Sequence, residues 1–461
     1  TFEPEEVTRL RLHNEHGDFA LERRDSVWWI VEPMETRADA DQISATLQNL
    51  RGAKRRNVFT PRDSLESYGL SAPETWVELE AGAGAQGRAR RVRVEFGSPA
   101  AQNYQVYARV EGEDAIFTLS DYSKSQCRKN LFTLRDKSLL AAAPENVERI
   151  ELAGPSLERA FVIARDSSEA QWRLEPGGRG ADPEEVNNWL RALLAARATR
   201  ILDSPATAPE EFALTSDTAQ LVIRLTLSTA AGAPPVALHF GRAEEGENPD
   251  TYCRVGEEPR FLLVRSALLK ELRKAPRDFR DRRLAPIPPT ALRAVRLTAS
   301  RRAVSFSRPA PEAPWRFDSP EGEYPPAERK IAALLRDLCF LQGKELLAEA
   351  EEADPVRLAL WGLDEPILQA RLHSFDSATT SGFDIGEPEG EQGIVYTRRL
   401  SDGAVLAVDF RRVTELFKFR DSLEDRALLA FTPGAVERVE LDFRGGEGEE
   451  RVFAHLTRGK Q

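Results

Sequence analysis

Residues 27–33, which read VWWIVEP, hold the pattern that decides the fold of this chain. An apolar, strand-like run carries Trp29, and Pro33 follows four residues later. The pattern returns as AQWRLEP, where Trp172 stands 143 residues after Trp29, and as APWRFDSP, where Trp315 stands another 143 residues on. Such a period exceeds the roughly 20 to 50 residues of solenoid repeats. The spacing therefore predicts tandem domains, each long enough to bury its own core.

Further landmarks recur in the same order and at nearly the same spacing. A strand motif opens each copy, an amphipathic helix follows each tryptophan, a later strand ends in glycine, and an aspartate closes the copy. The opening strands begin at Val7, Val147, Leu292 and, for a fourth time, Val436; the glycines are Gly97, Gly241 and Gly386; the closing aspartates are Asp136, Asp281 and Asp425. We therefore expect one type of domain, repeated along the chain.

The order of elements within a copy predicts its fold class. Three strands, a helix, several further strands and a closing helix follow one another, and Val92, Val94 and Phe96 alternate with charged residues, as in a sheet with one buried face. Because the strands outnumber the helices and do not alternate with them, we predict an α+β fold, with a mainly antiparallel sheet and two packed helices in each copy. The predicted domains are 1–144, 145–289 and 290–431, with the first strands of a truncated fourth repeat in 432–461.

The three repeated tryptophans, Trp29, Trp172 and Trp315, are predicted to be structural core residues. Each stands on an apolar strand that faces an amphipathic helix, where a large ring packs between the two elements. Burying such a ring contributes on the order of 2 to 3 kcal/mol. Exposed aromatic residues that bind a ligand are the alternative interpretation.

Composition opposes several classes of protein. Lys and Arg number 64 against 75 Asp and Glu, a net charge of −11, which opposes nucleic-acid binding because such binding requires a basic surface. No apolar run approaches the roughly 20 residues of a membrane span. Three cysteines at unmatched positions predict small buried residues instead of a disulfide framework. The chain starts at Thr1 and its one methionine is Met34, so we expect any membrane anchor to lie in a missing N-terminal segment.

Several of these motifs together resemble a bacterial tandem-repeat family known as domain of unknown function 4340. They are the W-x-x-x-x-P strand end, the aspartate-rich helix start, the Y-G-L-x-x-P motif at 68–73, the Y-x-R strand and the closing R-D pair. The resemblance covers essentially the whole chain. The second copy departs from it, because Phe212-Ala213-Leu214 replaces Y-G-L and no proline follows. A role that needs an identical motif in every copy is therefore not expected.

The resemblance implies a location and a partner. Members of the family resemble single-span proteins of the bacterial cell envelope, often associated with ABC transporter components of the gliding-motility accessory type. The resemblance thus implies an extracytoplasmic protein that faces the periplasm, is anchored to the inner membrane and has protein partners among transporter components. The family has no accepted catalytic residues, so none are carried over to this chain.

The residues themselves predict no catalytic site, no metal site and no cofactor. His13 and His16 are spaced like a metal-binding pair, but they stand at a predicted turn with no third ligand in view. The sequence contains no nucleophile elbow, phosphate-binding loop or dinucleotide fingerprint in the proper strand-to-helix context. An enzyme is therefore the least supported class.

A Tyr-x-Arg motif recurs on one strand of every copy. Its two side chains share a strand face, since they are two residues apart. One interpretation is a ligand or partner patch repeated along the chain. The favoured interpretation pairs each arginine with the aspartate that closes its copy, because a guanidinium binds a carboxylate through two hydrogen bonds. The motif residues are Tyr107 and Arg109, Tyr252 and Arg254, and Tyr396 and Arg398; the aspartates are Asp136, Asp281 and Asp425.

Three functions remain open from the sequence. The first is a non-enzymatic scaffold or interaction protein of the cell envelope, whose row of domains offers reach and repeated contacts. The second is a glycan- or peptide-binding array, with aromatic residues on matching faces of the repeats. The third is an enzyme, which would need a recessed pocket with convergent polar groups. We expect the first.

Overall fold

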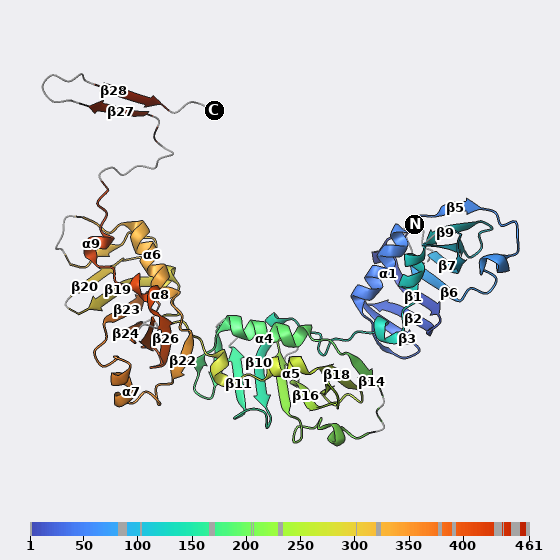
Figure 1. Cartoon of the computed structure of the whole chain (residues 1–461), viewed down its shortest axis with the longest axis horizontal. Coiled ribbons are helices and arrows are strands. Elements are labelled where there is room, and N and C mark those ends of the chain that lie inside the picture. Colours follow the sequence, from blue (N-terminus) through green and yellow to red (C-terminus); the bar gives the residue numbers. More distant parts are fainter. Residues whose placement is uncertain are drawn as a thin grey trace. The chain divides into compact units, whose positions relative to one another are not determined.

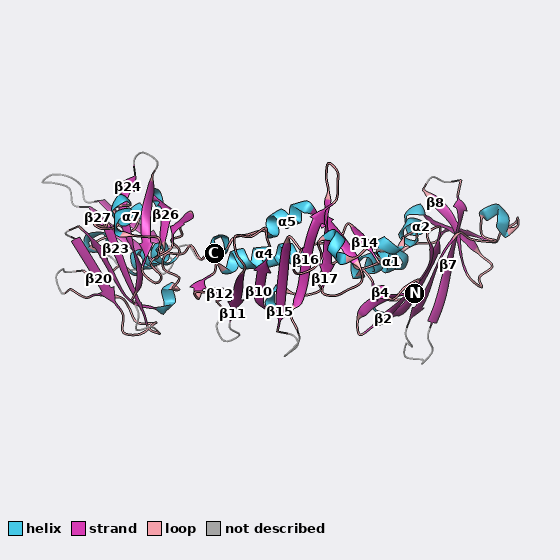
Figure 2. Ribbon diagram, turned by 90° about the horizontal axis from the view of Figure 1, so that it is seen from below, coloured by secondary structure: helices cyan, strands magenta, loops and turns pink. Residues whose placement is uncertain are grey.

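Three antiparallel sheets, one in each predicted repeat, dominate the computed structural model (Figure 1). In the second repeat, helices α4 (Pro183–Ala195) and α5 (Ser266–Leu272) pack side by side next to its sheet (Figure 2). The predicted α+β class and the threefold repetition are confirmed. The structure describes residues 2–81, 90–101, 104–165, 171–203, 205, 207–228, 234–300, 302–319, 324–376, 380–389, 393–427, 436, 438–443 and 452–457.

The first repeat has, within the described residues, a nine-stranded sheet in the order β4-β3-β2-β1-β6-β7-β8-β9-β5. Neighbouring strands are antiparallel throughout, so two meanders are joined through the β1–β6 pair. The elements are β1 (Val7–Asn14), β2 (Gly17–Arg24), β3 (Val27–Glu32), β4 (Thr36–Arg37), α1 (Ala40–Gly52), β5 (Arg56–Phe59), β6 (Thr75–Ala81), β7 (Arg90–Pro99), β8 (Gln105–Val110), β9 (Ile116–Ser120), α2 (Asp121–Cys127) and α3 (Leu131–Leu134).

The other two repeats use the same strand order. The second sheet runs β13-β12-β11-β10-β15-β16-β17-β18-β14, and the third has eight strands in its described part, β21-β20-β19-β23-β24-β25-β26-β22. The second repeat contains β10 (Val147–Ala153), β11 (Phe161–Arg165), β12 (Trp172–Glu175), β13 (Arg179–Gly180), β14 (Arg200–Leu202), β15 (Leu221–Leu227), β16 (Val236–Ala243), β17 (Asp250–Val255) and β18 (Phe261–Arg265). The third contains β19 (Leu292–Ala299), β20 (Arg302–Ser307), β21 (Arg316–Phe317), α6 (Glu328–Cys339), β22 (Glu345–Ala348), α7 (Pro355–Leu360), β23 (Leu368–Ser374), β24 (Ser381–Glu389), β25 (Ile394–Arg399), β26 (Val405–Asp409), α8 (Phe410–Thr414) and α9 (Arg420–Leu423). None of the helices in the described ranges is both long and apolar enough to span a membrane.

Strand alternation and a capped helix explain the local structure of the first repeat. Leu10 and Leu12 on β1 are buried, while Arg11 between them is exposed. Helix α1 begins after Asp39, whose carboxylate accepts hydrogen bonds at 3.1 Å from the N–H groups two and three residues on. A cap of this kind contributes about 1 kcal/mol. The apolar stripe of α1, which includes Ile43, then joins the same core cluster as the β1 leucines.

The core tryptophan of the first repeat is Trp28, one position before the predicted Trp29. Trp28 is 7% exposed and belongs to the core, whereas Trp29 is only half-buried. Neighbouring residues of a strand point to opposite faces, so only one of the two rings enters the core. The carbonyl of Trp28 accepts a hydrogen bond from the N–H of Ala38 at 2.9 Å. The carbonyl of Trp172 makes the same contact with Ala181 at 2.8 Å, so Trp28 is its counterpart and the prediction for Trp29 is wrong.

The other two tryptophans pack against the cores of their repeats. Trp172 is 2% exposed within the core of the second repeat. Trp315 is half-buried and packs edge-to-face on Phe306, with ring centroids 5.3 Å apart, beside the core of the third repeat. Arg165 stands 4.8 Å from the ring of Trp172 and Arg308 stands 4.7 Å from the ring of Trp315. Each of these rings thus also receives a cation–π contact.

The departure of the second copy from the Y-G-L motif leaves the backbone unchanged. Gly69 and Gly362 have φ angles of 67° and 64°, and Ala213 adopts the same left-handed conformation with φ of 55°. A Cβ atom on Gly69 would lie 2.8 Å from the backbone nitrogen of Ser98, so the first repeat requires glycine at this turn. The second repeat keeps the turn with a residue that is less suited to it.

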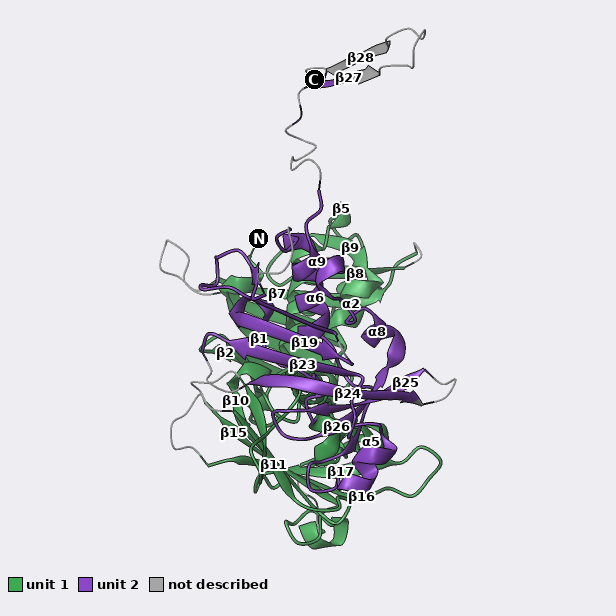
Figure 3. Ribbon diagram, turned by 90° about the vertical axis from the view of Figure 1, so that its left-hand side faces the viewer, with its two compact units in different colours: residues 1–279 green, residues 280–461 purple. Residues whose placement is uncertain are grey.

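The chain forms two compact units, Thr1–Phe279 and Arg280–Gln461 (Figure 3). The first unit contains the first two sheets, and the second contains the third sheet and a hairpin. That hairpin pairs β27 (Arg438–Phe443) with β28 (Val452–Thr457) in antiparallel register. It belongs to the predicted fourth repeat, of which residues 432–435, 437, 444–451 and 458–461 lie outside the described residues.

The three cysteines are buried and free, as predicted. Burial raises the pKa of Cys127 to about 12, and it raises the pKa of Cys339 to about 12 as well. Burial also raises the pKa of Cys253. The thiols therefore stay protonated at neutral pH and act as small core residues.

Replacing Trp28 with alanine is predicted to lower the free energy of unfolding by about 3 to 5 kcal/mol, because a buried ring and its contacts are lost. Trp29→Ala is the matched control and should cost less than half as much, since its ring already lies partly in water. Urea unfolding followed by circular dichroism measures both losses. Equal losses, or a larger loss for Trp29→Ala, would contradict the assignment of Trp28 to the core.

Candidate functional site

A short extended segment follows the closing helix of the first repeat and lies against the second repeat. We call this segment, residues 135–139, the first strap. In its own repeat, the N–H of Asp136 donates to the carbonyl of Arg37 at 2.8 Å. On the other side, the N–H of Ala198 in the second repeat donates to the carbonyl of Lys137 at 2.8 Å, and an antiparallel bridge follows one residue further on. The strap therefore makes backbone hydrogen bonds to both repeats.

A buried arginine at the start of the first strap reaches into the second repeat. Arg135 is 3% exposed, and its Nη1 and Nη2 donate to the two carboxylate oxygens of Asp203 at 2.9 and 2.8 Å. Asp203 directly follows β14, the strand at the edge of the second sheet. A bidentate ion pair of this kind fixes the relative orientation of the two side chains and also pairs their charges. Loss of Asp203 would leave a buried guanidinium without its partner.

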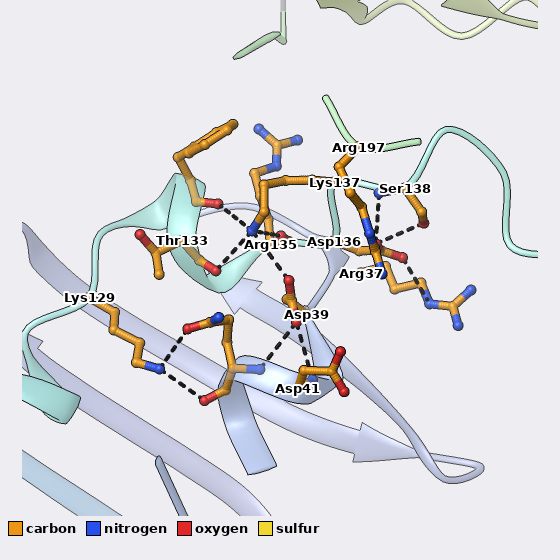
Figure 4. Close-up of polar contacts among 12 residues, drawn as sticks. Arg37, Asp39, Asp41, Lys129, Thr133, Arg135, Asp136, Lys137, Ser138 and Arg197 are labelled. Atoms are coloured by element: carbon orange, nitrogen blue, oxygen red, sulfur yellow. Dashed lines mark hydrogen bonds and ion pairs between the residues drawn. The ribbon is translucent and has the colours of Figure 1, made fainter. Parts of the chain in front are cut away.

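Two aspartates organise the other polar contacts of the first strap (Figure 4). Asp136 accepts hydrogen bonds from the N–H and the hydroxyl of Ser138 at 2.9 and 2.8 Å, and from Arg197 of the second repeat at 3.0 Å. Asp39, which caps α1, lies 3.3 Å from the Nζ of Lys137. Both carboxylates therefore serve as structural acceptors that hold the strap in place.

A polar cavity of about 300 Å³ lies beside the first strap and is lined from both repeats. The first repeat contributes Trp28, Asp39 and Asp41, among others, and the second contributes Leu194 and Arg197. Asp39 is already engaged by the helix cap and by an ion pair. A general base must lie within reach of a substrate proton and be able to accept it, and the contacts of Asp39 already occupy its carboxylate. We therefore interpret this cavity as a gap at the interface between the first two repeats and not as a catalytic site.

The same arrangement recurs 145 residues later, within the second unit. The second strap, residues 280–284, follows the second repeat along the chain and contacts the third. The carbonyl of Arg282 accepts a hydrogen bond from the N–H of Gly343 at 2.9 Å. Arg280 is 2% exposed and donates to Glu349 at 2.8 and 3.1 Å. Glu349 directly follows β22, the edge strand that corresponds to β14, so both straps use an arginine and an acid in the same way.

The second strap has a further acidic partner. Nη2 of Arg280 donates to Asp402 at 2.6 Å, and Asp402 also accepts hydrogen bonds from Arg399 at 2.8 Å. Burial by itself would raise the pKa of Asp402, but the two arginines outweigh it and lower the pKa to about 2. Burial would likewise lower the pKa of Arg280, but its hydrogen bonds to Glu349 and Asp402 raise it above the ordinary value. Arg280 and Asp402 therefore both stay charged at neutral pH.

The third repeat breaks this pattern. Glu424 stands where the first two repeats have Arg135 and Arg280, and it is 5% exposed. Its carboxylate lies 3.1 Å from Arg420 and 2.9 Å from Arg426, both in the third repeat. The hydrogen bond from Arg426 lowers the pKa of Glu424. This side chain is therefore satisfied within its own repeat.

The tyrosines of the Tyr-x-Arg motifs pack against the aromatic residues of the Y-G-L motifs. The ring centroids are 5.0 Å apart for Tyr107 and Tyr68, 4.3 Å for Tyr252 and Phe212, and 6.0 Å for Tyr396 and Trp361. Arg109 donates to Glu95 at 2.5 Å, and Glu95 is the residue directly opposite on β7. The predicted pairing of Arg109 with Asp136 is therefore wrong, because the cross-strand acid takes its place.

The arginines of the other two motifs have different surroundings. Arg254 donates from Nε to the carbonyl of Glu258 at 3.0 Å. Arg398 makes no ion pair with Asp425 in the described part of the third repeat. Asp425 instead accepts a hydrogen bond at 3.0 Å from the backbone N–H two residues on. The motif thus has a common packing role for its tyrosine and no common partner for its arginine.

The two histidines that are spaced like a metal pair have other contacts. Nδ1 of His13 lies 2.7 Å from Asp18, and its ring stacks on Trp76 with centroids 5.4 Å apart. His16 lies 3.6 Å from Glu15. Within the ranges that the structure describes, no group of three or more His, Cys, Asp or Glu side chains is arranged to hold a metal ion.

Sequence reasoning did not identify the strap arginines or their acids. The available signal is the R-D pair in LRDKSLL and FRDRRLA, of which the sequence prediction gave a partner to the aspartate and none to the arginine. The acid partners stand 68 residues after Arg135 and 69 residues after Arg280, in segments without a recognisable motif.

Asp402 makes the stability of the third repeat depend on pH. Its pKa is about 2 in the folded state, below its ordinary value of 3.8, so its contribution is present above a pH of about 4 and is lost as the pH falls toward 2. We predict that Asp402→Asn lowers the free energy of unfolding at pH 7 by about 2 kcal/mol and flattens the acid profile. Asp364→Asn, at an exposed position of the same repeat, is the control. Urea unfolding from pH 2 to 7 would contradict this account if the two variants had the same profile.

Comparison with known protein families also finds three repeats in the chain. The model of the family described as Domain of unknown function (DUF4340) matches residues 28–179, 172–314 and 315–461. These matches begin at Trp28, Trp172 and Trp315, which agrees with the corrected register of the first repeat. No similar curated protein and no similar solved structure was found. Because the three matches cover most of the sequence, the chain belongs to the DUF4340 family and contains three copies of its domain.

Proposed function

We propose that this protein is a non-enzymatic scaffold that holds DUF4340 domains in series and presents them to protein partners. The recurrence of the strap is the observation that carries the proposal. Arg135 lies at the start of the strap that follows one repeat, and its guanidinium donates to Asp203 of the next repeat. Arg280 makes the equivalent contact with Glu349. A buried arginine of a strap that pairs with a carboxylate of the repeat that follows thus occurs twice, which supports a role in which the order of the domains matters.

Family membership supports the location in this proposal. The resemblance to DUF4340 proteins implies an envelope protein, so we place the full-length protein on the periplasmic side of the inner membrane, with a membrane anchor. Its partners are then components of an ABC-type transporter of the gliding-motility accessory kind. Domains in series provide reach from a membrane and several contacts to one partner, which raises the effective concentration of each contact.

An exposed apolar face on the third repeat is the partner surface that we favour. Helix α7 carries Val356 and Leu360, which are 71% and 78% exposed. Residues four apart share one face of a helix, so these two side chains form a single apolar patch. The corresponding segments of the other repeats are short 3-10 turns, Leu65–Tyr68 and Pro209–Phe212. Large apolar side chains exposed together are typical of a contact with another protein.

Site-specific photo-crosslinking in the native cells tests this proposal. We predict that a photoreactive amino acid at Leu360 of the full-length protein captures a subunit of an ABC-type transporter, identified by mass spectrometry. The same amino acid at Lys270, an exposed position of the second repeat, is the control and should capture much less of that subunit. Capture of no transporter subunit at Leu360, or equal capture at both positions, would contradict the proposal.

A further inference from the structure

The first repeat carries a polar cleft whose lining includes no strap residue. Its volume of about 480 Å³ lies within the roughly 300 to 1,000 Å³ of ligand pockets. It is formed by the end of α1, the start of β5, the start of β8 and the β9–α2 connection. Its lining includes two tyrosines, two cations and an asparagine: Tyr104, Tyr122, Lys54, Arg56 and Asn49.

Tyr104 has a conformation and an exposure that the fold does not require. Its side chain is 87% exposed, and its φ of 62° lies in the left-handed region that favours glycine. The third repeat places Gly393 at this position, with φ of 63°. The N–H of Asp121 donates to the carbonyl of Tyr104 at 2.9 Å, and the N–H of Phe410 donates to that of Gly393 at 2.7 Å. A strained, exposed tyrosine where another repeat uses glycine indicates a function.

Four other lining residues present side-chain groups that no described residue binds. Tyr122 is 61% exposed and is the second residue of α2, where the corresponding helices α5 and α8 carry an alanine and an arginine. The side chains of Lys54 and Arg56 have no ion pair or hydrogen bond with any described residue. The Oδ1 atom of Asn49 is buried and receives no hydrogen bond there. The cleft thus offers two aromatic faces, two unpaired cations and a buried acceptor.

We propose that this cleft binds an acidic saccharide, a sugar chain that carries carboxylates. The carboxylates would pair with Lys54 and Arg56. The apolar faces of the sugar rings would pack on Tyr104 and Tyr122, and a sugar hydroxyl would donate to Asn49. Single-stranded nucleic acid uses similar groups, but the net charge of −11 opposes it. The tyrosines are confined to the first of the three repeats, so the site goes beyond the proposed scaffold function and does not depend on it.

Isothermal titration calorimetry of the full chain with tetragalacturonic acid tests the proposal. We expect a dissociation constant of about 1 mM or lower, and weaker binding when salt is added. Maltotetraose, an uncharged sugar chain of the same length, should bind at least about tenfold more weakly. Absence of binding by tetragalacturonic acid, equal binding of maltotetraose, or tighter binding of a hexathymidylate or a hexaglutamate peptide would overturn the proposal.

Tyr104→Gly is the decisive variant, because the third repeat shows that glycine suits the same backbone. It should keep or raise the midpoint of thermal unfolding and weaken binding at least about tenfold. Lys54→Gln combined with Arg56→Gln should weaken binding to a similar degree and remove its salt dependence. Tyr324→Ala, at an exposed tyrosine of the third repeat, is the matched control and should leave binding unchanged. Full affinity in the Tyr104→Gly protein would overturn the proposal.

Discussion

The contact between the first and second repeats depends on the buried guanidinium of Arg135, which donates to both carboxylate oxygens of Asp203. Each repeat has a core of its own, and the last residue of a strap enters the next core: Leu139 in the second repeat and Leu284 in the third. A desolvated arginine is stable only with its partner in place, and it therefore fixes the edge of the second sheet against the strap. The backbone contacts of the strap with the second repeat are made to Arg197 and Ala198, which precede that edge strand. The pair recurs as Arg280 and Glu349 at the second strap.

Individual repeats differ at their surfaces while their sheets stay the same. The first repeat has a strained, exposed tyrosine, Tyr104, where the third has Gly393. The third repeat has an exposed apolar helix face and replaces the strap arginine with Glu424, which its own arginines satisfy. None of these changes touches the alternating apolar residues that build the cores. Repeats of one fold can thus keep the same sheet and core while their exposed surfaces differ.

The fold was predictable from the sequence because its signals are local or periodic, whereas the connections between repeats were not. Strand alternation, the cap at Asp39 and the recurring tryptophans act over a few residues or at a fixed spacing. The register of VWWIVEP was misassigned because both tryptophans lie in a continuous apolar run, where alternation does not distinguish the two faces. Asp203 stands 68 residues from Arg135, and only the tertiary fold brings the two together. The cleft was missed because the exposure and φ of Tyr104 are invisible in the sequence.

Hydrogen exchange of the full chain, read at single amides, tests the strap most directly. The N–H of Ala198 donates to the carbonyl of Lys137, and the N–H of Gly343 donates to that of Arg282. Both amides should exchange far more slowly than in an unfolded chain, and Arg135→Met should speed exchange at Ala198 while Gly343 stays protected. Fast exchange at Ala198 in the unmodified protein, or no change there in Arg135→Met, would contradict the account.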